Sequence, residues 1–225
     1  MAAEPAARWL IEVVYRKTGP ALLVGHLDVL RAFERALRRA SLPIAHTEGF
    51  NPRPKIVFAS PLGVGASGDE ERACLTLERP MEPVDVLKAL GPRMQPGIEL
   101  HQACALPGRK PPPYHLIPWA DWRVSLPPDT ADHADLHRRC ADLLARPEVV
   151  VERERKGKKR TLDLRPAIET LRAAGDDQLT MRLQMDAGPT VKPVEVVEAL
   201  GLPTGSEHQP HPISRRERLA PAPEA

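Results

Sequence analysis

The sequence has few cysteines, and this shortage excludes two classes of protein. Only three cysteines, Cys74, Cys104 and Cys140, occur among 225 residues. Their odd number and long, unequal gaps exclude a disulfide framework, and they form no CxxC-type metal or iron–sulfur motif. We therefore predict semi-buried thiols in a reducing cytosol, with no metal and no cofactor.

Long apolar runs are also missing. The sequence contains no stretch of about 18 apolar residues, which a membrane-spanning helix would need. The first nine residues, MAAEPAARW, lack the apolar core of a signal peptide. We expect a soluble, cytoplasmic protein that does not contact a membrane.

Aromatic residues and net charge are both low. Aromatics make up 4% and all hydrophobic residues 42% of the chain, so the cores are expected to consist of Leu, Val, Ile and Ala. The net charge is only +2. Because the overall charge does not identify a nucleic-acid-binding protein, any such function depends on where the cations lie.

The first hundred residues alternate between strand and helix patterns. Apolar, β-branched stretches predict strands at 8–16, 55–62, 72–80 and 97–106, with a glycine-rich turn at 62–70. Helices are predicted at 26–39 and 82–94. This β-α-β-β-α-β order is that of the ferredoxin-like unit, and it predicts a first domain at 8–107.

The second half repeats this order less regularly. A proline-rich linker at 108–118 precedes a second domain at 119–219, and the tail at 220–225 is predicted to be disordered. Helix 166–175 has no place in a second such unit, and the closing strand is expected near 211–220. The fold class is therefore α+β, with two tandem ferredoxin-like domains, the second less regular. The elements predicted here are strands at 121–126 and 178–185, two strands within 148–165, and helices at 131–146, 166–175 and 192–201.

The first helix carries two different stripes. Apolar side chains at steps of three and four predict one buried face. Arg31, Arg35 and Arg38 form a basic stripe opposite to it. This stripe is either a solvated face, with Glu34 and Arg38 paired one turn apart, or a surface that contacts phosphates. The apolar face consists of Leu27, Leu30, Phe33, Leu37 and Ala40.

The stretch RERKGKKR at 153–160 is the most basic segment of the chain. Repulsion among cations at a hairpin tip favours a bound polyanion, although charged tips also serve solubility. Neither predicted sheet carries an aromatic-rich RNA-recognition run, so recognition of the RNA backbone or shape is more consistent with the sequence than base stacking on a sheet. The cations are Arg153, Arg155, Lys156, Lys158, Lys159 and Arg160.

The loop HTEGFNPRPK at 46–55 connects the first helix to the second strand. Gly49 permits unusual backbone angles, and the two prolines favour extended geometry in the residues before them. We predict that Phe50 anchors the loop in the core. Asn51, Arg53 and Lys55 would then be displayed near the basic face of the helix.

His26 and His46 are the candidate catalytic residues. A general acid or base role is conceivable for either, but their spacing matches no recognised motif for metal ligation or catalysis. His26 with Asp28 could instead cap the first helix. The sequence therefore favours a protein that is not an enzyme.

Long stretches of the chain resemble a known family. GHLDVLRAFERALRRASLPIAHTEGFNPRPKIVFASPLGVG, DLRPAIETL and TVKPVEVVEALGL resemble blocks of the radical SAM-linked family of bacterial proteins. This resemblance implies an accessory protein, a domain of unknown function fused to or encoded beside a radical S-adenosylmethionine protein, in RNA or ribosome-related metabolism. Because this chain has no Cx3Cx2C motif, radical chemistry would belong to that partner. Relative to the family, His46 replaces a commoner aromatic, and Arg53 replaces a commoner histidine.

Three functions follow as hypotheses. The favoured one is a non-catalytic accessory module that contacts RNA or another polyanion, such as a ribosome-related particle, through its basic surfaces. The second is a metal-independent endoribonuclease of tandem ferredoxin-like architecture that uses His26 or His46. The third is a protein-interaction scaffold that does not bind nucleic acid.

Overall fold

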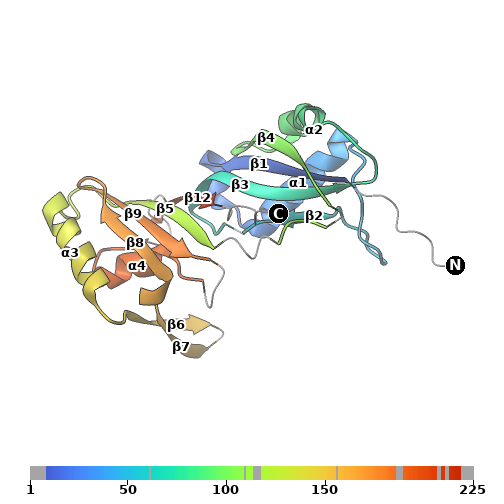
Figure 1. The fold of residues 1–225 in the computed structure, drawn as a ribbon. Coiled ribbons are helices and arrows are strands. Elements are labelled where there is room, and N and C mark those ends of the chain that lie inside the picture. The colour runs from blue at the N-terminus through green and yellow to red at the C-terminus, as the bar shows by residue number, and fades with distance from the viewer. Residues whose placement is uncertain are drawn as a thin grey trace. The chain divides into compact units, whose positions relative to one another are not determined.

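The chain divides into two compact units, Met1–Tyr114 and His115–Ala225, and each is described by itself. The structure is a computed structural model that describes residues 9–60, 62–108, 110–113, 118–155, 157–185, 190–206, 209–210 and 213–218 (Figure 1). The side chains of Arg155, Lys158 and the residues after 204 are not described. The boundary between the units lies within the proline-rich segment 108–118.

The first unit contains an antiparallel sheet and two helices. Strand pairing gives the order β4-β1-β3, and β2 pairs with β3, all antiparallel. Along the chain the order is β1-α1-β2-β3-α2-β4, with single 3₁₀ turns before α1 and after α2. The elements are β1 (Trp9–Lys17), η1 (Gly19–Leu23), α1 (His26–Ala40), β2 (Ile56–Phe58), β3 (Ala66–Leu77), α2 (Pro83–Leu90), η2 (Gly91–Arg93) and β4 (Ile98–Leu106).

Both helices of this unit pack on the sheet face that carries Ile11, Val13 and Tyr15 of β1. Phe33 of α1 is fully buried, and its ring centroid lies 5.2 Å from that of Tyr15. The predicted buried face was wrong at one end, because Leu27 is 64% exposed. Small alanines instead let the helix approach the sheet, so the buried stripe is Val29, Ala32, Phe33, Ala36 and Leu37.

Strand β3 begins earlier than the sequence predicted. Residues 62–70 were expected to form a turn, yet β3 starts at Ala66. Backbone pairing with β1 continues through Tyr15↔Glu71 to Lys17↔Gly68, with a register shift between these two pairs. An irregularity of this kind accommodates a glycine inside a strand, so a glycine-rich composition did not indicate a turn.

The second unit also contains an antiparallel sheet and two helices. Its strand order is β12-β5-β9-β8, and a separate hairpin, β6–β7, is inserted between α3 and β8. Without the hairpin and two short bridging strands, the chain order is strand-helix-strand-strand-helix-strand, as in the first unit. The elements are β5 (Trp119–Ser125), α3 (His133–Ala145), β6 (Val150–Arg155), β7 (Lys158–Asp163), η4 (Arg165–Ala167), β8 (Ile168–Ala173), β9 (Gln178–Gln184), α4 (Pro193–Ala199), β10 (Gly205–Ser206), β11 (Gln209–Pro210) and β12 (Ile213–Arg218).

The segment predicted as helix 166–175 is strand β8, so that prediction was wrong. Ile168 and Leu171 are both buried at a spacing of three, which is typical of a helix. In the structure, the β8–β9 register shifts between Ile168 and Thr170. This β-bulge adds one residue and brings both apolar side chains to the same face of the sheet.

The other predicted elements of this unit are present. Helices α3 and α4, strands β5 and β9 and the β6–β7 hairpin are confirmed, and β12 supplies the predicted closing strand. The α+β class is confirmed as well. The tail at 220–225 lies outside the described residues, and none of the helices in the described part is long and apolar enough to cross a membrane.

The corrected face of α1 leads to a stability prediction. Phe33→Ala should lower the free energy of unfolding by about 3–5 kcal/mol, because it leaves a cavity beside the rings of Tyr15 and Phe58. Leu27→Ala, the matched control on the same helix, should change it by less than about 0.5 kcal/mol, as is usual for an exposed site. Urea denaturation measures both. Equal losses would contradict the assignment of the buried face.

Candidate anion-binding surface

The basic stripe of α1 is exposed, as the sequence predicted. Arg31 donates from Nη1 to Asp28 Oδ1 at 3.2 Å, and Arg35 donates from Nη2 to Gln95 Oε1 at 3.3 Å. Arg38 has neither a hydrogen bond nor an ion pair from its side chain within the described part of the chain. The predicted pair between Glu34 and Arg38 does not form there. Two of the three arginines therefore have no carboxylate partner.

Two further arginines lie beside this stripe. Arg39 donates from Nη2 to the carbonyl oxygen of Arg93, and Arg93 donates from Nε to the carbonyl oxygen of Arg39 at 3.0 Å. Arg93 belongs to η2 and lies 54 residues away in the sequence. No sequence signal could have linked it to α1. Among the described residues, none of these arginines forms an ion pair, and together we name them the α1–η2 arginine patch: Arg35, Arg38, Arg39 and Arg93.

The patch has an ordinary structural role besides any binding role. Arg38 and Arg39 lie in the last turn of α1, where cations interact favourably with the helix dipole. Arg93 also donates from Nη1 to the carbonyl oxygen of Ala89 at 2.8 Å, near the end of α2. Backbone carbonyls neutralise no net charge, so the guanidinium groups remain available to an anion.

The loop at 46–55 is a small hairpin with fixed geometry. Thr47 N donates to Arg53 O at 2.8 Å, and Lys55 N donates to Ala45 O at 2.7 Å. The Thr47 hydroxyl also accepts from Arg53 N at 3.0 Å. Gly49 has φ +125°, a value that few L side chains tolerate, so its predicted conformational role is confirmed.

Arg53 brings this hairpin close to the basic stripe. Its Nη1 lies 4.0 Å from Oε1 of Glu34, a half-buried residue of α1 between Arg31 and Arg38 in sequence. One turn of helix separates each of these arginines from Glu34, so all three side chains share a face. Arg53 thus extends the cationic surface of α1. Asn51 is exposed beside it, whereas Lys55 is half-buried.

Phe50 does not anchor the loop in the core, so that prediction was wrong. Its relative exposure is 106%, the highest of the exposed large hydrophobic residues. The backbone hydrogen bonds of the hairpin hold its two arms together without any help from the ring. The loop therefore projects an aromatic side chain into solvent, close in sequence to Arg53.

The two candidate histidines show no catalytic arrangement. The His26 ring packs edge-on against Phe58, with centroids 5.2 Å apart, and burial lowers the pKa of its imidazole. His46 is exposed and forms a backbone bridge with Pro54. Neither side chain has a hydrogen-bond or ion-pair partner among the described residues. A general base is normally oriented by such a partner.

The cysteines also lack the features of a reactive or metal-binding site. Burial, with the nearby Glu12 carboxylate, raises the pKa of Cys74 to about 12. Burial raises the pKa of Cys140 to about 11. Within the described ranges, no group of three or more His, Cys, Asp or Glu residues could hold a metal ion.

Arg153, a predicted anion-binding residue, is held in an internal ion pair. Its Nε lies 2.5 Å from Glu195 Oε1 and its Nη2 lies 2.6 Å from Oε2, and it also donates to Thr190 O at 2.6 Å. The hydrogen bonds that Arg153 donates to Glu195 raise the pKa of the guanidinium above its ordinary value. Lys192 N donates to the same carboxylate at 2.8 Å. These contacts attach strand β6 to the beginning of α4.

The rest of the basic hairpin is partly neutralised. Lys159 Nζ lies 3.3 Å from Glu152 Oε2, whereas Arg160 is exposed. Lys156 lies outside the described residues, and Arg155 and Lys158 are described as backbone only, paired in the β6–β7 register. The described side chains of the hairpin therefore offer fewer uncompensated cations than the α1–η2 arginine patch.

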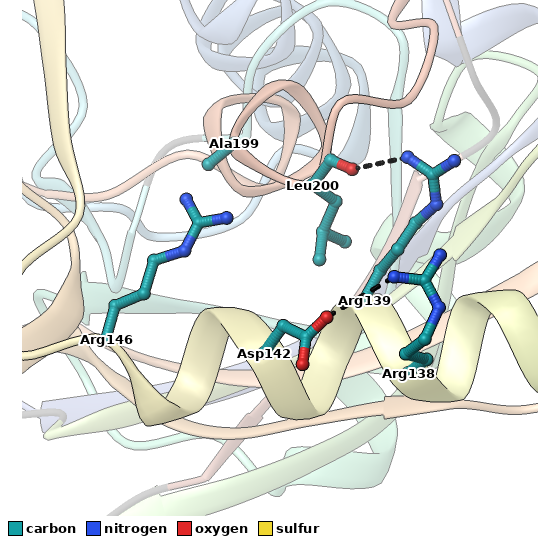
Figure 2. A pocket seen from close by; sticks show the side chains of 6 residues that line it. All are labelled: Arg138, Arg139, Asp142, Arg146, Ala199 and Leu200. Carbon is teal, nitrogen blue, oxygen red and sulfur yellow. Dashed lines mark hydrogen bonds and ion pairs between the residues drawn. The ribbon is translucent and has the colours of Figure 1, made fainter.

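A hollow of about 230 Å³ lies between α3 and the end of α4 (Figure 2). Arg139 donates from Nη1 to Leu200 O at 3.0 Å and pairs through Nε with Asp135 Oδ2 at 2.7 Å. Arg138 pairs with Asp135 as well as with Asp142, at 3.4 Å from the latter. The Arg146 side chain points into the hollow and has no hydrogen-bond or ion-pair partner among the described residues. Two of the three arginines that line the hollow form ion pairs with carboxylates, so the hollow is a poor anion site.

The comparisons with known proteins identify a family. Residues 11–193 match the family described as "Uncharacterized protein conserved in bacteria (DUF2344)". The chain belongs to this family. No curated protein matches the sequence.

Among solved structures, the DUF2344 chain is similar to one described as "Crystal Structure of an Unknown Protein from Galdieria sulphuraria". The identity is 13% and the TM-score 0.30, and the match covers 95% of this chain and 100% of that chain.

The Arg153–Glu195 pair should be important for the stability of the second unit. Arg153→Ala is expected to cost about 2–3 kcal/mol, because it leaves a largely buried carboxylate without its partner. Arg153→Lys should restore only part of this, since an ammonium cannot reproduce the two parallel hydrogen bonds. Urea denaturation measures the loss, and hydrogen exchange should show reduced protection of β6 and β7. Lys159→Ala, which removes an exposed pair, should cost no more than about 1 kcal/mol. Equal losses for the two alanine variants would contradict this role.

Asp135 gives the second unit a pH dependence. Hydrogen bonds from Arg139 and then Arg138 lower the pKa of its carboxyl below the ordinary value of 3.8. The ion pairs therefore contribute stability above that value, which is lost as the pH falls through the lower folded-state pKa. Asp135→Asn should lower the melting temperature at pH 7 and reduce its fall in acid. Glu148→Gln, at an exposed site with no ion pair in the described part, should leave the pH profile unchanged. Parallel profiles for Asp135→Asn and the wild type would contradict this assignment.

Proposed function

We propose that this chain is a non-catalytic accessory module that binds the phosphate backbone of RNA through its first unit. The observation that carries the proposal is the α1–η2 arginine patch beside Arg53. Its four guanidinium groups form no ion pair in the described part of the chain, and Arg53 lies near Arg31 and Arg38. Like charges gathered on one surface repel one another, and a polyanion relieves that repulsion.

The proposed architecture is a pair of ferredoxin-like units. Each unit has the chain order strand-helix-strand-strand-helix-strand, once the β6–β7 hairpin and the short β10 and β11 strands are left out of the second. The sheet orders β4-β1-β3-β2 and β12-β5-β9-β8 are then equivalent. On this interpretation, the second unit is less regular because a hairpin is inserted after its first helix.

We also propose that a radical S-adenosylmethionine protein is the partner, working beside this chain in RNA or ribosome-related metabolism in the cytoplasm. This part rests on the family resemblance of the sequence blocks. The partner would supply the chemistry, and this chain would hold the RNA. That division of roles agrees with the surroundings of His26 and His46, which lack the orienting contacts of an endoribonuclease acid or base.

A protein-interaction scaffold is the second candidate. Besides Phe50, several large apolar side chains of the first unit are exposed, among them Leu23, Leu27 and Val64. Exposed apolar groups of this kind occur at protein–protein contacts. The scaffold and the RNA module differ in one measurement, because only the RNA module requires the arginines of α1.

Salt dependence tests the proposal. Full-length protein should bind a labelled single-stranded RNA at low salt, with an affinity that falls steeply as salt is added. Arg35→Glu, Arg38→Glu and Arg53→Glu combined should reduce the slope of log K against log[salt] by about 2, at about 0.7 per phosphate contact. Fluorescence anisotropy measures the slope.

The matched control is Arg172→Glu, which reverses an exposed arginine on β8. This variant should bind RNA like the wild type. Replacing Lys159 and Arg160 by Glu, which reverses their charge, tests the β6–β7 hairpin as the alternative RNA-binding surface. The absence of RNA binding by the wild type at low salt would refute the RNA module and leave the scaffold.

A further inference from the structure

Phe50 has no structural role in the fold that would explain an aromatic side chain at its position. The chain has only three phenylalanines. Phe33 is fully buried, and Phe58 forms ring contacts with Tyr15, Phe33 and His26. Phe50 alone of the three stands fully exposed, at the tip of the 46–55 hairpin. A fully exposed ring adds no buried apolar area to the folded state. Because single exposed apolar residues are common on protein surfaces, what surrounds the ring decides whether a ligand is expected.

The arms of the loop that carries Phe50 are paired with each other. Gly49 turns the backbone before it, and the paired arms of the loop, from Ala45 to Lys55, fix the position of both ends. A side chain presented by a pre-formed loop binds without an additional cost for ordering that loop. Phenylalanine also has only two side-chain torsions to fix on binding.

The surroundings of Phe50 favour a nucleobase over an apolar protein surface. The remaining residues of the 46–55 loop include no other large hydrophobic side chain. The exposed neighbours are Glu48, Asn51 and Arg53, and Arg53 lies beside the stripe of α1. A single aromatic ring among polar and cationic groups matches a stacked base with its phosphates nearby, whereas a protein contact usually presents several adjoining apolar residues.

We propose that Phe50 stacks on an unpaired base while the neighbouring arginines contact its backbone, so that the ligand of this surface is a single strand rather than a duplex. This inference rests on the proposed function and adds the class of nucleic acid. Bases inside a duplex are already stacked on each other and present no free face to the ring. Stacking is tolerant of sequence, so little base preference is expected.

The test compares strands with full-length protein in fluorescence anisotropy. The probes are a labelled 12-nucleotide RNA without self-complementarity, the same RNA annealed to its complement, and single-stranded DNA of the same sequence. Phe50→Ala should weaken binding to the single-stranded RNA by about tenfold, the usual effect of losing one stacked base. Binding to the duplex should not change. If Phe50→Ala weakens binding to single-stranded RNA and DNA equally, the protein recognises the base and the phosphate. If binding to RNA is weakened more, the site also contacts the 2′-hydroxyl. Both results support stacking.

Two substitutions separate stacking from simple apolar contact. Phe50→Trp should retain or improve the affinity for single strands, because it keeps an aromatic face. Phe50→Leu should lose about as much as Phe50→Ala, although it keeps apolar bulk. Val84→Ala, which shortens another exposed apolar residue of the first unit, is the matched control and should bind like the wild type.

The outcomes also separate this inference from the proposed function. Stacking would be overturned if RNA binding requires the α1 arginines but the wild type and the Phe50 variants bind RNA with the same affinity. The proposed RNA module would then remain. Full affinity in Phe50→Leu would likewise overturn stacking in favour of apolar contact. Absence of RNA binding by the wild type would remove both proposals. Since Phe50 is exposed, circular dichroism should show all of these variants folded.

Discussion

The packing of one face of α1 against the sheet of the first unit determines where the charges of that unit lie. Phe33 fills the space between Tyr15 and Phe58, and small alanines allow the helix to approach the strands closely. With this face buried, the arginines at steps of three and four must point outward. The proposed RNA-binding surface is thus a consequence of core packing.

The second unit shows the opposite use of cations. Arg153 pairs with Glu195 of α4 and donates to the carbonyl oxygen of Thr190. Arg139 pairs with Asp135 of its own helix and donates to the carbonyl oxygen of Leu200 at the end of α4. Such contacts attach the inserted hairpin to α4, and α3 to the end of α4. A cation used in this way is not available to a ligand. A segment rich in Lys and Arg can therefore be structural, while scattered arginines from distant segments form the open surface.

The proposed mode of binding combines contacts from arginines to phosphates with one contact from an aromatic ring to a base. Phosphate contacts through guanidinium groups would supply affinity without sequence preference, and one exposed ring would select an unpaired base. An accessory module needs no acid, base or metal of its own for this task. The paired arms of the 46–55 hairpin are useful to it, since they place Phe50 and Arg53 on one pre-formed loop.

The sequence by itself determined the α+β class, most element positions and the basic face of α1, because these depend on local periodicity. It could not distinguish a helix from a bulged strand at Ile168 and Leu171, since both place residues three apart on one face. It also could not place Phe50, because apolar character indicates burial only on average. Only the tertiary structure decided that Arg93 joins α1, that Arg153 is paired with Glu195 and that Phe50 is exposed. Each of these depends on contacts or backbone pairings that local sequence patterns do not encode.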